Sequence, residues 1–189
     1  MTEIKDDKLK EITIGERKPH NNTITLVDYD PEWPKKFQFE YTRIKELLGN
    51  RALAIEHVGS TSVPGLPAKP IIDILLVVAD SADETSYVPF LEHAGYILRI
   101  REPDWYEHRL LKGPEFPVNL HVFTKGSVEI NRMLLFRNHL RTNTEDKELY
   151  LNTKKELASK VWKYVQDYAD AKSEVVDAII NRASQLTTT

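Results

Sequence analysis

The chain has 189 residues, 41% of them hydrophobic and 29% charged, a composition typical of one globular domain. It contains no cysteine, which excludes disulfides, thiolate zinc sites and cysteine nucleophiles. The formal net charge of −3 argues against nucleic acid as a partner, because nucleic-acid surfaces usually show a basic excess, but it allows a local basic pocket for phosphates.

The N-terminal part begins with a polar stretch. Residues 1–22 lack sustained periodicity, and we predict a mobile or loosely docked tail ahead of a single domain over residues 23–189. The charged start has no apolar core of the signal-peptide kind. Residues 23–27 have a short β-type pattern. A helix is predicted from Asp30, its N-cap, to Gly49, because apolar residues recur at helical spacing.

Two strands and a loop follow this helix. Residues 52–58 form the first predicted strand, and residues 59–70 are rich in Gly, Ser and Pro, which indicates a loop with room for one helical turn. Residues 71–79 are apolar on both faces, so we expect a central strand. This longest apolar run contains Asp73 and is too short to span a bilayer, so we expect a cytoplasmic protein with no membrane partner.

The remainder of the chain contains further predicted helices and strands. A short helix, disturbed by Pro89, is predicted over residues 83–94. Three further strands are predicted at 96–100, 106–111 and 118–124. The turn GPEFP joins the last two as a hairpin, and Ser127 can cap a helix to about residue 141. The C-terminal residues 143–187 have a helical pattern with one or more breaks around 163–170.

This order of elements indicates the α+β fold class. We expect a mixed, mostly antiparallel sheet with helices on one side, together with a C-terminal helical part.

The loop after the first strand has the residue types of a phosphate-binding loop. Gly59 lets the backbone approach a ligand closely, and Ser60, Thr61 and Ser62 supply hydroxyl groups and the amides of a following turn. Such a loop suits the triphosphate of a nucleotide. The alternative is a tight turn built from small residues. The segment matches neither a Walker A loop nor a nucleophile elbow.

Asp73 is the second chemical signal. A carboxylate within an apolar strand is unfavourable unless it is paired or binds a metal ion. The interpretation as a metal ligand competes with a structural salt bridge, for example to Lys69 or to an arginine.

The segment EHVGSTSVPGLPAKPIIDI resembles the signature of the GrpB family, a branch of the nucleotidyltransferase fold. The resemblance extends to WPKKFQFE, NLHVF, FRNHLR and YADAKSEVV, and so covers most of the chain after residue 22. It implies a nucleotidyltransferase-like fold and ancestry. It does not supply a reaction.

The resemblance also implies a metal site and shows where this chain departs from it. Nucleotidyltransferases of this fold carry Gly-Ser, then two carboxylates separated by one residue, then a third on a neighbouring strand, and these carboxylates hold two metal ions. Asp73 matches the first carboxylate, but the second position is Leu75. Strand 118–124 offers His121 and no acid. The resemblance therefore implies one Mg²⁺ or Mn²⁺ at most, held by Asp73, His121 and the phosphates of the nucleotide.

Four further basic residues are candidates for binding phosphate. Lys69 follows the loop closely. Arg109 is a phosphate ligand or, instead, His108 is a general base, since adjacent strand residues point to opposite faces; cross-strand pairing is the alternative for both. Arg137, one helical turn before Arg141, either clamps phosphates with it, or the two belong to a solvated basic face or pair with Glu145 and Asp146.

The fourth basic candidate, Lys172, is carried over by the resemblance, as is Lys154. For a lysine on a helix the ordinary interpretation is a solvated side chain.

Two main functions and a third, weaker one are consistent with these residues. The first is a nucleotidyltransferase-type enzyme in which Asp73 and His121 are catalytic and the loop and basic residues bind the nucleotide. The second is a non-catalytic module that binds a nucleotide or phosphorylated metabolite, which the leucine at position 75 favours. A third hypothesis is a phosphate-handling enzyme that uses His108 or His121 as its acid or base without a metal pair.

Overall fold

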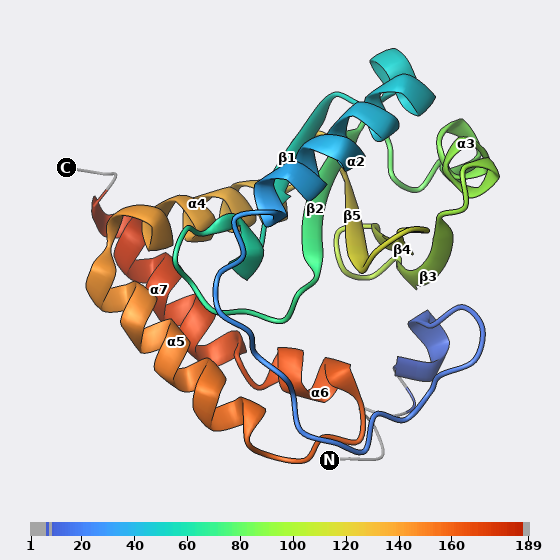
Figure 1. The fold of residues 1–189 in the computed structure, drawn as a ribbon. Coiled ribbons are helices and arrows are strands. Elements are labelled where there is room, and N and C mark those ends of the chain that lie inside the picture. Colours follow the sequence, from blue (N-terminus) through green and yellow to red (C-terminus); the bar gives the residue numbers. More distant parts are fainter. Residues whose placement is uncertain (1–6, 8, 187–189) are drawn as a thin grey trace.

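The structure, a computed structural model, describes residue 7 and residues 9–186 (Figure 1). The predictions for residues 1–6, 8 and 187–189 lie outside the described residues. Within the described part of the chain, no helix is long and apolar enough to cross a membrane.

The centre of the molecule is a five-stranded sheet. Its strands are β1 (Ala54–Val58), β2 (Ile72–Val78), β3 (Ile97–Glu102), β4 (His108–Lys112) and β5 (Val118–Thr124). Their spatial order is β1-β2-β5-β4-β3, and only the β2/β5 pair is parallel. The predicted α+β class, the position of β2 between two other strands and the β4–β5 hairpin are confirmed.

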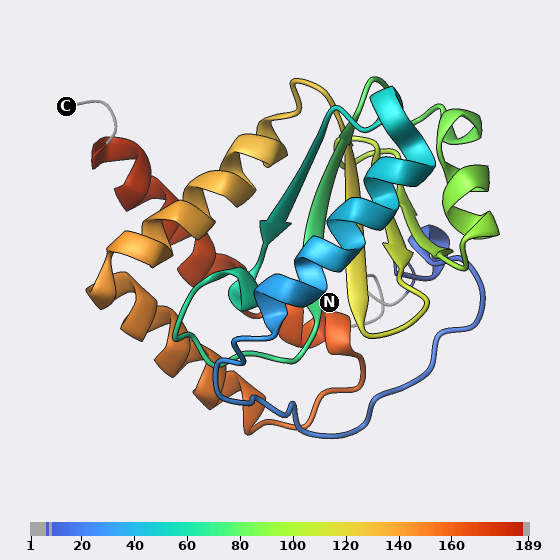
Figure 2. The same cartoon turned by 45° about the horizontal axis from the view of Figure 1, so that its top comes forward.

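One face of the sheet packs against two helices from the N-terminal half. Helices α2 (Trp33–Leu48) and α3 (Val88–His93) cover this face, as Figure 2 shows. The core between them is apolar because alternate residues of each strand point the same way. Its central members are Trp33, Ile44, Ile72, Ile74, Leu76, Leu111, Leu120 and Val122.

The opposite face, which we call the Asp73 face, is only partly covered by helix. Helix α4 (Val128–Thr142) contributes Ile130, Met133 and Leu134 to a second core with Leu75 and Phe123. The expectation that helices lie on one side of the sheet is therefore wrong. The reason is that Leu75 and Val77 are apolar on this face too and are buried by α4.

The C-terminal helices complete the molecule beside the sheet. Helices α5 (Thr144–Ala158) and α7 (Ser173–Leu186) pack with α4, and the short α6 (Val165–Asp170) lies near the chain segment that leads into β2 (Figure 1). Two breaks lie on either side of α6, at residues 159–164 and 171–172, so a helix occupies most of the interval in which breaks were predicted.

The N-terminal segment differs from its prediction in detail. Residues 23–27 form no strand and make a single bridge between Val27 and Ala68. Thr13 forms a bridge with Ile100, so this part of the segment lies along the edge strand β3. Helix α2 begins at Trp33 rather than Pro31, because the Asp30 side chain accepts the Glu32 N–H (2.9 Å) within a turn that precedes the helix.

Candidate functional site

The loop between β1 and β2 passes directly against the Asp73 carboxylate. Gly59 has φ +67°, a conformation that side-chain-bearing residues rarely adopt. A Cβ at this position would lie 2.5 Å from Asp73 Oδ2. Glycine is therefore required here twice, by backbone conformation and by the space that the carboxylate occupies.

The three hydroxyl groups of the loop differ in their hydrogen bonds. Thr61 is buried and donates to the Ile71 carbonyl (3.1 Å), and Ser62 is buried and donates to the Gly59 carbonyl (2.6 Å). These two side chains hold the loop in shape, within the predicted turn at Ser60–Ser62. Among the described residues, the Ser60 hydroxyl makes no hydrogen bond and is partly exposed, so it is the one hydroxyl left for a ligand.

Asp73 is held by side chains from the parallel neighbour β5. Asn119 donates its amide N–H to Asp73 Oδ1 (2.7 Å), and His121 Nε2 lies 3.6 Å from the same oxygen. Burial alone raises the pKa of Asp73, but the contacts with His121 and Asn119 and the charge of Lys69 outweigh burial and lower it below its usual value. Asp73 is thus an ionised carboxylate with an exposed edge.

A second histidine lies directly behind His121. His121 Nδ1 is 3.1 Å from His108 Nε2, and His108 Nδ1 is 2.6 Å from Glu102 Oε2. Burial lowers the pKa of His108, while Glu102 acts in the opposite direction. Because His108 contacts His121, it is the one of the two adjacent candidates on β4 that lies on the Asp73 face.

Arg109 lies on the other face of the sheet. It pairs in register with Val122, and its guanidinium contacts Glu84 (2.5 Å) and Glu107 (3.1 Å). The structure does not bring Arg109 together with Asp73, because neighbouring strand residues point to opposite faces and His108 takes the side of the site. Arg109 is thus paired with two acids outside the strands, which is neither the cross-strand pairing nor the contact with phosphate that the sequence suggested.

Arg137 and its neighbour Arg141 tie helix α4 to the loop. Arg137 contacts Glu56 (2.7 Å) and the His57 carbonyl (2.9 Å), and Arg141 donates two hydrogen bonds to the Ser62 carbonyl. Both guanidinium groups are thereby engaged in fixing the loop. Their partners are on β1 and the loop; Arg137 is partly buried, whereas Arg141 is exposed.

The expected position of the second carboxylate is closed to a metal ion. Leu75 is fully buried under α4. Within residues 9–186, no group of three or more His, Asp or Glu side chains is arranged to hold a metal ion. Asp73 and His121 remain as one oxygen donor and one nitrogen donor.

Lys69, Lys154 and Lys172 lie close to one another, and Lys69 is also near Asp73; we call these three residues the lysine cluster. Lys69 Nζ and Lys172 Nζ lie over the same ring of Tyr168, at 5.5 and 4.6 Å from its centroid. Lys154 is 2% exposed and donates to the Pro67 carbonyl (2.6 Å). None of the three has a carboxylate within ion-pair distance in the part of the chain that the structure describes.

Burial and repulsion from Lys172 act together on the other two lysines. Burial, followed by the charge of Lys172, lowers the pKa of Lys69 to about 8, and the same causes lower that of Lys154 to about 7. Asp73 raises the pKa of Lys69, which places that lysine within electrostatic reach of the carboxylate. Binding of an anion would relieve this repulsion between neighbouring cations.

Lys154 is more deeply buried than its sequence context indicated. We expected a helical lysine to be solvated, yet Lys154 lies in a buried stripe of α5 with Tyr150 and Leu157. The signal was its helical phase, since it follows Tyr150 by one turn and precedes Leu157 by slightly less.

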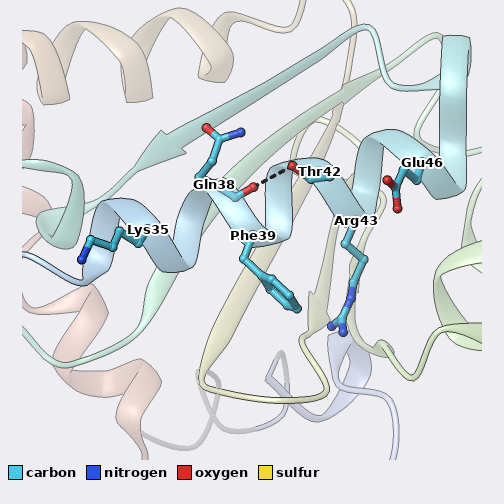
Figure 3. A pocket seen from close by; sticks show the side chains of 6 residues that line it. All are labelled: Lys35, Gln38, Phe39, Thr42, Arg43 and Glu46. Atoms are coloured by element: carbon cyan, nitrogen blue, oxygen red, sulfur yellow. Dashed lines mark hydrogen bonds between the residues drawn. The ribbon is translucent and has the colours of Figure 1, made fainter.

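A shallow hollow elsewhere on the surface has no connection with these residues. It lies along the outer side of α2 and contains none of the predicted site residues (Figure 3). It is lined by Lys35, Gln38, Phe39, Thr42, Arg43 and Glu46. Thr42 donates its hydroxyl to the Gln38 carbonyl (3.1 Å).

Comparisons with known proteins agree with the geometry. The family model described as GrpB protein matches residues 23–182. A UPF0157 protein of Halalkalibacterium halodurans is 63% identical over 95% of this chain and 92% of its own length. The crystal structure of the conserved protein GrpB from Enterococcus faecalis superimposes with a TM-score of 0.76 and 32% identity over 87% of this chain and 100% of that one.

A more distant structural likeness concerns the fold alone. A structure of the Cid1 poly(U) polymerase matches with a TM-score of 0.50 and 12% identity, over 82% of this chain and 47% of that chain. The mixed sheet, the Gly-Ser loop before a buried strand and Asp73 on that strand are thus found in a nucleotidyltransferase-like fold. The match over residues 23–182 and the similarity to its named relatives establish that the chain belongs to the GrpB family.

Proposed function

We propose that the protein binds a nucleoside triphosphate, or a related phosphorylated metabolite, between the loop at Ser60 and the lysine cluster. The observation that carries the proposal is the cluster itself: Lys69, Lys154 and Lys172 have no carboxylate partner among the described residues, and burial together with the charge of Lys172 lowers the pKa of the other two. Holding such cations together lowers the stability of the folded chain, and a polyphosphate would remove that penalty.

Each group has a separate part in this binding. Lys69 and Lys172 would contact the terminal phosphate oxygens, since their side chains are partly exposed and share the Tyr168 ring. The Ser60 hydroxyl would donate to an oxygen nearer the nucleoside. Arg137 and Arg141 would act only through the loop that they hold, and Arg109 has no part because it lies on the other face.

The donor atoms near Asp73 fit one divalent cation that arrives with the ligand. Asp73 and His121 Nε2, 3.6 Å from Asp73 Oδ1, supply two donors, and phosphate oxygens and water would complete the shell. A bound Mg²⁺ or Mn²⁺ would neutralise charge on the transferring phosphoryl group. We propose on this basis that the protein transfers a nucleotidyl group with one metal ion.

The proposed transfer relies on positioning and charge rather than on covalent chemistry by the protein. Asp73 stays ionised through its contacts with Asn119 and His121. The lysine cluster would stabilise the charge of the departing pyrophosphate.

The test is a panel of nucleoside triphosphates, nucleoside monophosphates and inorganic tripolyphosphate, each with and without Mg²⁺ or Mn²⁺. Binding is measured by isothermal titration calorimetry, and transfer by release of pyrophosphate. We expect the Lys172→Met variant to bind triphosphates at least about tenfold more weakly and the Lys155→Met variant, which changes an exposed lysine of α5, to bind like the wild type. If no phosphate compound binds to the wild type, the proposal is wrong.

A second candidate function is binding without transfer. It is favoured by the burial of Leu75 in the core beneath α4, which removes one of the carboxylates that a two-metal site requires. Tight binding that a chelator leaves unchanged, with no pyrophosphate released, would identify this function. Metal-dependent release of pyrophosphate that disappears in Asp73→Asn would identify transfer.

A further inference from the structure

An exposed tryptophan lies on the Asp73 face of the sheet. Trp105 belongs to the turn between β3 and β4 and is 40% exposed. Its ring meets the rings of His108 (5.2 Å between centroids) and Phe123 (5.7 Å) edge-on. His108 contacts His121, and Phe123 packs under α4, so both partners belong to the Asp73 face and hold Trp105 there.

The turn that carries Trp105 is strained. Tyr106 has φ +55° and Glu107 has φ +52°, and residues with side chains rarely adopt two such angles in succession. Such conformations lower the stability of the fold and persist only where the surrounding contacts fix them. The fixing contacts are the hydrogen bond from the His108 N–H to the Trp105 carbonyl (3.1 Å) and the ion pair between Glu107 and Arg109 (3.1 Å). Backbone strain of this kind is common in ligand-binding segments, and here it accompanies the placement of Trp105 against His108.

The broad faces of the Trp105 indole carry no stacked ring within the described residues. Its aromatic contacts with Tyr106, His108 and Phe123 are all edge-on, at interplanar angles of 61°, 86° and 72°. The exposed part of the indole is therefore open to a planar ring of a ligand. Stacking on a tryptophan is a common way to bind such a ring.

Two imidazole rings lie between Trp105 and the Asp73 carboxylate. His121 Nε2 is 3.6 Å from Asp73 Oδ1, and the His121 ring stacks on that of His108 (5.3 Å), which meets Trp105. The side chain of His121 is 21% exposed, so the row of rings borders solvent. Trp105 is thus connected to the proposed phosphate site by a continuous strip of side chains on one face.

The register of the sheet separates Trp105 from the lysine cluster. Lys69 precedes β2, whereas Phe123, which contacts Trp105, pairs with Val77 near the end of that strand. At about 3.3 Å per residue, the stretch from Asp73 to Val77 covers about 13 Å. Phosphates held at Ser60 and the lysine cluster therefore stay away from the indole, and only a ligand with a further organic part extends to it.

We propose that Trp105 is the stacking surface for the base of a bound nucleotide. This inference rests on the proposed function for the position of the phosphates. It also sharpens that function, because it makes the ligand a nucleotide rather than a phosphorylated metabolite without a planar ring. Stacking accepts every common base, since each base offers a flat aromatic face.

The first measurement compares nucleoside triphosphates with inorganic tripolyphosphate by calorimetric titration of the full chain. Loss of one stacked base weakens binding by about 5- to 150-fold. We expect a loss in that range when Trp105→Leu is titrated with the common nucleoside triphosphate that binds the wild type most tightly. Tripolyphosphate should bind this variant and the wild type equally, which also shows that the variant is folded.

Two further variants control this comparison. Trp105→Phe keeps an aromatic ring and should retain most of the affinity for the nucleoside triphosphate. Phe90→Leu changes an aromatic side chain of α3 that is also 40% exposed but lies on the other face of the sheet, and it should leave both affinities unchanged.

The second measurement is tryptophan fluorescence, which reports on the indole directly. The chain has three tryptophans; Trp33 is 1% exposed in the core, and Trp162 is partly buried beside Leu157. We expect a nucleoside triphosphate to quench the emission of the wild type and tripolyphosphate to leave it unchanged. The quenching should disappear in Trp105→Phe.

The inference is overturned if Trp105→Leu binds the nucleoside triphosphate as tightly as the wild type. It is also overturned if this variant loses affinity for tripolyphosphate to the same extent, because Trp105 would then act on the fold or on the phosphates. If tripolyphosphate binds but no nucleoside triphosphate quenches Trp105, the phosphate site stands and the stacking surface fails. If nucleoside triphosphates bind through Trp105 and Lys172→Met leaves their affinity unchanged, the stacking surface stands and the lysine cluster fails. If no nucleoside triphosphate binds, both are wrong.

Discussion

The substitution Lys154→Met separates stability from binding most directly. Lys154 is 2% exposed, and its pKa is lowered from an ordinary 10.5 to about 7. At about 1.4 kcal/mol per pH unit, this pKa difference corresponds to a destabilisation of roughly 5 kcal/mol for the charged form. About 4 kcal/mol of this destabilisation applies at pH 7, because half of the folded chains already carry the neutral amine there. This penalty falls on the folded state, because the unfolded chain hydrates the ammonium group.

Methionine has a similar length and no charge, so it fills the same space without that penalty. The lost hydrogen bond to the Pro67 carbonyl offsets about 2 kcal/mol of the gain. We therefore expect the variant to be about 2 kcal/mol more stable than the wild type at pH 7. We also expect it to bind tripolyphosphate about tenfold more weakly, since one cation of the cluster is removed.

The assay is urea unfolding followed by circular dichroism, with calorimetric titration of tripolyphosphate on the same samples. The control Lys155→Met changes the adjacent exposed lysine and should leave both quantities within about 0.5 kcal/mol of the wild type. A Lys154→Met variant that is less stable than the wild type would refute the conclusion that the buried ammonium group of Lys154 destabilises the folded chain. Unchanged affinity for tripolyphosphate would remove Lys154 from the binding site.

The remaining expectations concern pH, the missing carboxylate, the loop glycine and the excluded arginine. The folded pKa of Lys154 lies below its unfolded value, so the unfolded chain binds more protons than the folded chain between about pH 7 and 10.5. In urea unfolding, the stability of the wild type should therefore rise across that window relative to the stability of Lys154→Met. Leu75→Asp places a carboxylate beneath α4 and should destabilise the fold by about 3–5 kcal/mol without strengthening Mn²⁺ binding; a gain in Mn²⁺ affinity by electron paramagnetic resonance would contradict the burial argument. Gly59→Ala should cost about 2 kcal/mol more than Gly65→Ala, because both positions have positive φ but only the first meets Asp73, and equal melting temperatures would argue against that contact. Arg109→Met should lower stability by about 1–3 kcal/mol through lost ion pairs, yet leave the calorimetric affinity for tripolyphosphate unchanged.

The local pattern of the sequence identified the segment on which the site is built. A strand, a loop of small residues and a second apolar strand with one acid could be recognised because their signals are local and follow one another directly along the chain. The strand at 118–124 and the helix after Ser127 were located equally well. Gly59 and Asp73 could be assigned to one site because the loop that begins at the glycine leads straight into the strand that carries the acid.

The tertiary structure decided which neighbouring side chains serve that segment. Alternation along β4 implied that His108 and Arg109 diverge, but only the register with β5 shows that His108 faces His121. Arg137 is committed to Glu56, 81 residues away, and no local pattern records that pairing.

The same holds for the residues whose environment is set by packing. Leu75 looked like a vacant ligand position in the sequence, and the position of α4 makes it part of the core. Lys154 looked like a solvated lysine, and the packing of α5 against the segment before β2 buries it beside Lys172. The sequence alone determined the loop, the strand and Asp73, because those depend on local conformation; the charge balance around them depends on long-range contacts, which only the folded chain defines.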